Sequence, residues 1–258
     1  MVSQSAPGER RSIGKEFGIF LLCLIPILLF VFRKGLEPNQ VLFANDAPLG
    51  VLMSQADEAA QAFTGYWTPN NWLGIEQPSA LPTFTATLFL VINDPVLFAK
   101  WYAPLSLLFS ALCTWYCFRK LGFHAAVCVI GAIAALLNMN SLSNAAWGLP
   151  VRAISLGLGM LAVAALHGTL RGWWVLKAML AGACVALSIM EGFDVGALYS
   201  LWLGAFAFYT GWLRPGTTGA RILRGAAQLA VVALFAVVVS AAALQTLIGT
   251  QIVGVAGM

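Results

Sequence analysis

Long apolar runs, separated by short polar turns, make up most of the chain. A helix needs about 20 mostly apolar residues to cross the hydrocarbon core of a bilayer. The pattern predicts an all-α polytopic membrane protein with a tail over residues 1–16 and a transmembrane domain over 17–258. The seven predicted spans lie at roughly 17–32, 96–118, 123–140, 151–170, 174–190, 195–213 and 225–248.

Two shorter helices are expected in the long loop 33–94 that follows the first span. Over 47–64 the apolar residues fall on one helical face and the charged residues on the other, as in a helix that lies along a membrane surface. The apolar run 81–93 is too short to cross a bilayer, and it predicts a re-entrant or interfacial helix that starts at Pro82. Loops of this length are usually functional or disordered, and the aromatic residues of this one favour function.

Composition supports the same fold class. Hydrophobic residues make up 60% of the chain and charged residues 9%, whereas soluble domains carry about 25% charged residues. Lipid is therefore expected to be most of the solvent of this protein. The chain has no basic stripe of the kind that binds nucleic acid, so no nucleic-acid partner is predicted. All five cysteines fall inside apolar runs and predict neither a disulfide framework nor a metal site.

The positions of the charged residues predict the orientation. Short cytoplasmic loops are enriched in lysine and arginine. With the N-terminus in the cytoplasm, ten of the fourteen basic residues lie inside, and eight of the ten acidic residues lie outside. The first apolar run follows Arg10, Arg11 and Lys15 but has no cleavage pattern, so it is predicted to be an uncleaved anchor. We expect a multi-pass protein of the bacterial inner membrane whose functional face is not cytoplasmic.

Asp46, in the first outer loop, is the first candidate for chemistry. Its carboxylate could act as a general base for an acceptor hydroxyl, or hold a divalent cation such as Mg²⁺ or Mn²⁺ on a phosphate. The alternative is structural, with Asn45 or Asp46 capping a helix that has Pro48 near its first turn. The two roles can coexist.

Glu191 and Asp194 lie in a very short outer connection between two predicted spans. An ionised group near the membrane plane costs free energy unless it is paired or hydrated, which favours a catalytic role over a position in headgroup water. Arg152 begins a span at its outer end and could bind a lipid phosphate with two N–H groups, or could extend to the headgroups. Trp67 and Trp72 lie in the long outer loop, where they could stack on a sugar, whereas the other tryptophans are expected at the membrane interface.

Three short motifs follow one another along the outer loop. They are Asn45-Asp46-Ala47-Pro48-Leu49-Gly50, then Tyr66-Trp67-x4-Trp72-Leu73-Gly74, then Gln77-Pro78-Ser79-Ala80-Leu81-Pro82. Together with the preceding span they resemble the bacterial YfhO-type membrane proteins, which are grouped with glycosyltransferases of the GT-C fold. Such enzymes transfer a sugar from a polyprenyl-phosphate carrier to an acceptor outside the cytoplasm.

The resemblance implies roles for the candidate residues. Asp46 would occupy the place of the acid in the first outer loop of GT-C enzymes, and Glu191 or Asp194 would supply a second acid. Asn45 stands where many such enzymes have another acid, so a metal is not implied directly. GT-C proteins usually have eleven or more spans, and the chain ends in an apolar run without a polar tail, which predicts an N-terminal portion of a longer protein.

The sequence therefore favours a membrane glycosyltransferase that uses a polyprenyl-phosphate-linked sugar donor. Asp46, Glu191 and Asp194 are the expected catalytic residues, and Arg152, Trp67, Trp72 and Asn45 are the expected substrate contacts. Membrane lipids and the lipid-linked donor are the expected partners. Two alternatives remain, a non-catalytic subunit of a larger membrane complex and a transporter of lipids or solutes. A transporter needs ionisable residues near the bilayer midplane, whereas the charges here lie near the ends of the spans.

Overall fold

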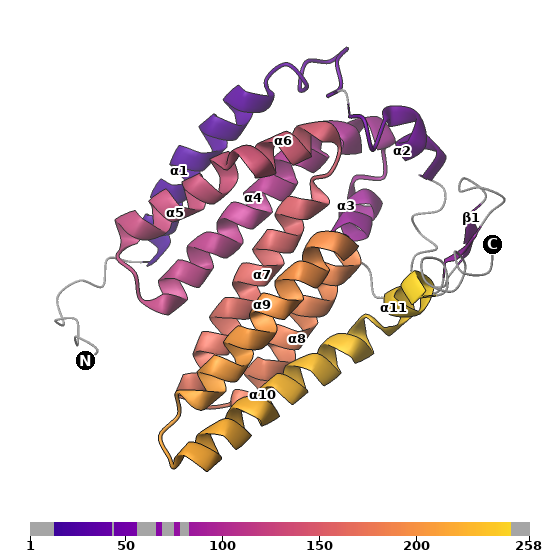
Figure 1. The fold of residues 1–258 in the computed structure, drawn as a ribbon. Helices are drawn as coiled ribbons and strands as arrows, with labels where there is room; N and C mark the ends of the chain where they lie inside the picture. The colour runs from indigo at the N-terminus through magenta and orange to yellow at the C-terminus, as the bar shows by residue number, and fades with distance from the viewer. Residues whose placement is uncertain (1–12, 43, 56–65, 69–74, 78–82, 249–258) are drawn as a thin grey trace.

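The computed structural model describes residues 13–42, 44–55, 66–68, 75–77 and 83–248 (Figure 1). Within these ranges the chain is almost entirely helical, apart from one short antiparallel pair of strands, β1 (Tyr66–Thr68) and β2 (Ile75–Gln77). The helices are α1 (Ile13–Phe32), α2 (Leu49–Gln55), α3 (Phe84–Ile92), α4 (Pro95–Leu121), α5 (Ala125–Leu137), α6 (Met139–Trp147), α7 (Val151–Gly168), α8 (Trp174–Glu191), α9 (Phe193–Trp212), α10 (Thr218–Val239) and α11 (Ala241–Leu247).

Five of these helices are long and apolar enough to cross a membrane: α1 from Gly14 onward, α4, α7, α8 and α10. The pair α5 and α6 qualifies as a sixth only when the two are counted together, and they are bent by 41° at their junction. The region 195–213, predicted as a span, forms α9, which is 20 residues long but is not among the five. The structure thus supports a multi-pass α-helical membrane protein with five or six such elements.

The long helices run alternately up and down one bundle (Figure 1). α4, α7 and α8 pack in sequence through its centre, with α9 and α10 against α8. α1 lies on the opposite side and contacts α4 and α5. Only 22% of the most apolar window of α1 and of α10 is buried, against 56% for α7. The two outer helices therefore present most of their apolar surface to the surroundings.

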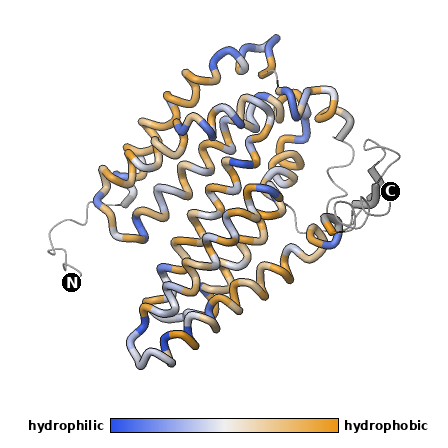
Figure 2. Tube along the Cα trace, in the orientation of Figure 1, coloured by the Kyte–Doolittle hydropathy of each residue, from blue (hydrophilic) through white to orange (hydrophobic). Residues whose placement is uncertain are grey.

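Buried and exposed positions follow the pattern expected of a protein dissolved in lipid. Ser106, Ser110 and Thr114 of α4 are buried, and the hydroxyls of Ser106 and Thr114 donate to the backbone carbonyls one turn earlier, at 2.7 and 2.9 Å. Large apolar side chains such as Leu22 and Leu234 are exposed. Small residues let helices approach closely in a membrane, where burial of apolar surface gives no advantage over lipid. Figure 2 shows that apolar positions extend along the outer helices.

α1 and α4 are joined near the N-terminal end of α1. Arg119 pairs with Glu16 at 3.2 Å, and the rings of Phe20 and Trp115 stack with their centroids 5.7 Å apart. The basic end of α4 therefore lies beside the start of α1, as the predicted alternation of the first two spans requires. Which side of the membrane this end faces remains a prediction.

Local signals explain where the loop helices begin. α3 begins at Phe84, two residues after the predicted start, because the Thr83 hydroxyl caps it by accepting from the Ala86 N–H. α4 follows immediately, with Asp94 as its N-cap and Pro95 in its first turn. Within the predicted surface helix 47–64 the structure shows α2, and residues 56–64 lie outside the described ranges.

The hairpin of α9 and α10 is fixed by one buried polar side chain. Gln228 is fully buried, donates to the Ala207 carbonyl at 3.1 Å and to the Thr210 hydroxyl at 2.7 Å, and accepts from Arg214 at 3.0 Å. Buried polar groups are costly unless they are hydrogen-bonded. Each of these contacts links α9 or the loop that follows it to α10, so α9 is an integral part of the bundle.

Candidate functional site

Asn45 and Asp46 are anchored to the turn between α6 and α7. Both backbone N–H groups donate to the carbonyl of Trp147, at 2.9 and 3.1 Å. The turn continues through Gly148, the C-cap of α6, which has a φ of +105°. A Cβ at this glycine would lie 2.8 Å from the Ala47 nitrogen, closer than any real Cβ contact. The loop that follows α1 therefore lies directly on the α6–α7 turn, at the end of the bundle where α7 begins.

The side chain of Asp46 is exposed and accepts a hydrogen bond of 3.2 Å from the Asn45 amide. Pro48, expected near the first helical turn, immediately precedes α2, and its carbonyl accepts from Val51 at 2.9 Å and Leu52 at 3.2 Å. The carboxylate of Asp46 is thus accessible from outside the bundle. It could act as a base or hold a cation that is bound to a phosphate.

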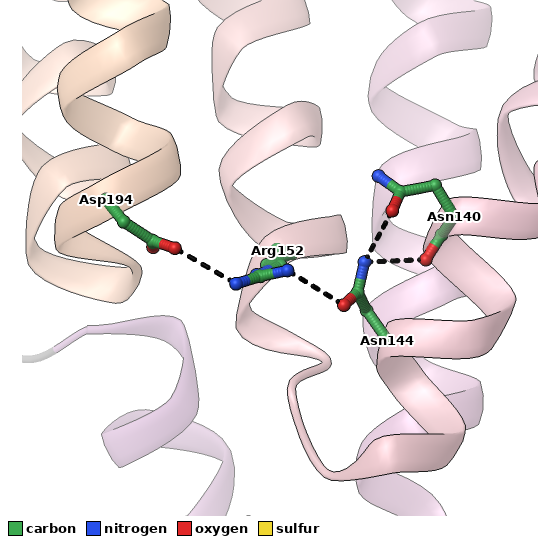
Figure 3. A network of polar contacts seen from close by, with 4 residues as sticks. All are labelled: Asn140, Asn144, Arg152 and Asp194. Atoms are coloured by element: carbon green, nitrogen blue, oxygen red, sulfur yellow. Dashed lines mark hydrogen bonds and ion pairs between the residues drawn. The ribbon is translucent and has the colours of Figure 1, made fainter.

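Arg152 and Asp194 form an ion pair between the starts of α7 and α9, with 3.0 Å between the guanidinium and the carboxylate (Figure 3). The other terminal nitrogen of Arg152 donates to the Asn144 side chain at 2.9 Å. Asn144 donates in turn to the carbonyl and the side-chain oxygen of Asn140. Two residues predicted separately from the sequence are therefore in direct contact, and asparagines of α6 extend the chain of contacts.

Glu191 lies in a different environment although it is only three residues from Asp194. Its side chain is buried and accepts from the Thr85 N–H at 2.9 Å and from the Thr85 hydroxyl at 2.6 Å. The Thr85 hydroxyl is also 2.7 Å from the Tyr102 hydroxyl. The first turn of a helix has free N–H groups and a partial positive charge, which favour a carboxylate there. This arrangement docks α3 onto α4 and α8.

The turn between α8 and α9 packs tightly against α7. The hydroxyls of Ser155 and Ser188 donate reciprocally to each other's backbone carbonyls, at 3.0 and 3.3 Å, and so join α7 to α8. A Cβ at Gly192 would lie 3.2 Å from the Ser155 hydroxyl, and one at Gly196 would lie 2.3 Å from the Ser188 carbonyl. The glycines allow the close approach that sends Glu191 towards α3 and Asp194 towards α7.

The remaining predicted contacts are described only in part. Trp67 lies in β1, where its backbone pairs with Glu76 of β2, and Trp72 lies outside the described residues. Within the described part of the chain, no group of three or more His, Cys, Asp or Glu side chains is placed to hold a metal ion. A cation at Asp46 would therefore need ligands from a phosphate, from water or from other parts of the protein.

Sequence reasoning did not find Thr85 and Tyr102. Thr85 is 106 residues from Glu191 along the chain, and neither residue lies in a polar cluster that would draw attention to it. A hydroxyl in the first turn of a short apolar helix was the only local signal.

The fold and the exposed apolar helices define the class of this protein as multi-pass α-helical membrane proteins. The chain matches no family model, and no curated protein or solved structure is significantly similar to it.

Proposed function

We propose that this protein is a membrane glycosyltransferase of the GT-C type that takes its sugar from a polyprenyl-phosphate donor on the extracytoplasmic face. The observation that carries the proposal is the seating of Asn45 and Asp46 on the Trp147 carbonyl. This contact with Trp147 brings an exposed carboxylate to the turn that precedes α7, five residues before Arg152. Transfer of a sugar from a lipid phosphate needs an acid and a cation, and both lie at this end of the bundle.

Asp46 acts as the general base in this proposal. The acceptor hydroxyl oxygen attacks the anomeric carbon of the sugar, and the bond between that carbon and the phosphate oxygen breaks. The phosphate leaves with the electron pair, and the proton of the acceptor passes to the Asp46 carboxylate. Because Asp46 is exposed, an acceptor can approach it without rearrangement of the bundle. Asn45, hydrogen-bonded to Asp46, is an additional substrate contact.

Arg152 binds the carrier phosphate. A guanidinium presents five N–H donors in a planar fork that matches two phosphate oxygens. Asn144 holds one terminal nitrogen, and Asp194 pairs with the other. The Asp194 side chain is 65% exposed, so an incoming phosphate can replace it at little cost. Asp194 then keeps Arg152 oriented when no donor is bound.

Glu191 has a positioning role in the same proposal. It is buried against the first turn of α3, and its oxygens already accept two hydrogen bonds from Thr85. By docking α3 it fixes the last part of the long loop that carries Asp46, Trp67 and Trp72. We assign sugar contacts to the two tryptophans by their place in that loop.

The proposed setting is the bacterial inner membrane with the N-terminus in the cytoplasm. The chain then crosses seven times, with α9 and the bent pair α5–α6 each counted as one crossing.

The test compares envelope glycans and lipid-linked sugars in cells with and without the gene, and in cells that carry single variants. Asp46→Asn and Arg152→Gln are expected to lose the product while reaching the membrane at normal levels. Glu37→Gln is the matched control, because Glu37 is a half-exposed acid of the same loop that pairs with Lys34. An unchanged product in Asp46→Asn would exclude Asp46 as the base. A product that needs the chain but neither residue would favour the alternative of a non-catalytic subunit.

A further inference from the structure

A cavity of about 400 Å³ lies between α4, α7 and α8, at the end of the bundle opposite Asp46. Its polar lining consists of Tyr116, Lys120, His167 and Lys177. The other lining residues are apolar or small, and none of the lining residues, all of which the structure describes, is acidic. Neither the glycosyltransferase proposal nor the packing of the bundle requires such a space.

The lining is divided by polarity along the helix axes. Lys120, His167 and Lys177 all lie within a turn of the helix ends, at the mouth of the cavity. The deeper wall is formed by apolar residues such as Leu161 and Cys184. Lys177 and Cys184 are seven residues apart on α8, which corresponds to about 10 Å along the axis. The cavity therefore has a cationic mouth and an apolar wall that runs towards the middle of the bilayer.

The two lysines are held at this mouth. Lys177 donates to the Gly168 carbonyl at 2.7 Å, and its stem lies across Gly168, where a Cβ would be 3.3 Å from Lys177 Cδ. An ammonium has three N–H donors, so two others can face a ligand. Lys120 lies over the Tyr116 ring at 5.3 Å. These contacts place positive charge from two different helices at one opening.

We propose that this cavity binds an anionic phospholipid, with the phosphate between Lys120 and Lys177 and one acyl chain along the apolar wall. Leu176 and Leu180 of α8 are half exposed, so the wall is continuous with the surface that faces lipid. Basic pockets between membrane helices bind anionic headgroups, which are concentrated in the cytoplasmic leaflet. The charges and the division of polarity therefore fit a phospholipid better than a soluble anion. This proposal uses no residue of the proposed active end.

The test measures lipid retention by the purified protein in detergent, by native mass spectrometry with added phosphatidylglycerol or phosphatidylcholine. The wild type is expected to retain phosphatidylglycerol preferentially. Lys120→Gln together with Lys177→Gln should weaken this retention about tenfold, whereas the two lysine-to-arginine changes should preserve it. The matched control is Arg221→Gln with Arg224→Gln, which removes two charges from α10 at the same end but outside the cavity. This control should retain the lipid like the wild type.

A second variant separates the cavity from its charge. Ala165→Phe leaves both lysines in place and fills the space, so it should also lower phosphatidylglycerol retention. An excess of inorganic phosphate should displace little lipid, because it cannot occupy the apolar wall. Equal losses in the α10 control, or undiminished retention in the lysine-to-glutamine pair, would overturn the proposal. Displacement by inorganic phosphate alone would do so too, since it would identify a simple anion site.

Discussion

Glu191 at the end of α8 accepts two hydrogen bonds from Thr85 in the first turn of α3, at 2.9 Å from the backbone nitrogen and 2.6 Å from the hydroxyl. The Tyr102 hydroxyl of α4 lies 2.7 Å from the same threonine oxygen. The end of α8 therefore meets α3 and α4, which lie about a hundred residues earlier in the chain, at one buried carboxylate. This polar contact adds to the packing of α3 on α4, where the rings of Phe84 and Phe89 lie 4.6 and 4.4 Å from those of Phe109 and Phe98.

Removal of this carboxylate should loosen α3. Glu191→Ala is expected to lower the free energy of unfolding by about 2–3 kcal/mol, because it removes a charged acceptor and leaves buried donors unpaired. Equilibrium unfolding in mixed detergent measures the loss, and amide hydrogen exchange over 84–92 should accelerate. Asp194→Ala, three residues away, should leave exchange in α3 unchanged. Equal exchange in the wild type and in Glu191→Ala would contradict the docking role.

The ion pair between Arg152 and Asp194 should contribute little to stability. The two side chains are 35% and 65% exposed, and exposed ion pairs are typically worth about 0.2–1 kcal/mol. A double-mutant cycle with Arg152→Gln and Asp194→Asn should therefore give a coupling energy in that range, decreasing as salt is added. A coupling energy of several kcal/mol would mean that the pair is a structural element and is not free to exchange Asp194 for a phosphate.

Gly196 should not tolerate a side chain. A Cβ there would lie 2.3 Å from the Ser188 carbonyl, and overpacking of this kind typically costs about 1–3 kcal/mol. Gly196→Ala should destabilise the protein by an amount at the upper end of that range, measured by thermal unfolding in detergent. Gly219→Ala is the matched control, since a Cβ there would have nothing within 4 Å and alanine favours the helix. Equal stability of the two variants would argue against the close approach of α8 and α9.

Accessibility labelling tests the orientation. In a chain with its five cysteines replaced by alanine, a single cysteine at position 46 should react with a membrane-impermeant maleimide in intact cells. A single cysteine at position 217, between α9 and α10, should react only after permeabilisation. The physical reason is the excess of lysine and arginine at the latter end. The reverse pattern would invert the map and place Asp46 in the cytoplasm.

The positions of the long helices could be predicted from the apolar runs alone. The run 96–118 corresponds to α4 (Pro95–Leu121), and 151–170 to α7 (Val151–Gly168). The apolar run 123–140 predicted one span, whereas the structure breaks it at Asn138 into α5 and the start of α6. Asn138 stops α5 and caps α6 by accepting from the Asn140 N–H, which bends the pair by 41°. Averaged hydropathy does not register a single capping residue.

The sequence predicted which residues belong to the candidate site better than it predicted the contacts between them. Charge position on the outer side singled out Arg152 and Asp194, and the structure joins them directly. The same reasoning put Glu191 beside Asp194 in one site, whereas the α8–α9 turn sends it towards Thr85. Pairings over such long separations depend on how helices pack, and the pattern of apolar residues along one helix does not record them.

Gly148 gives experimental control over the position of the loop that carries Asp46. Its φ of +105° and the 2.8 Å that would separate a Cβ from the Ala47 nitrogen mean that even one methyl group must push the loop off the turn. The aspartate that precedes Ala47 would then shift while its own chemistry stays intact. Gly148→Ala is thus a means of changing the position of the Asp46 carboxylate without changing its chemical identity.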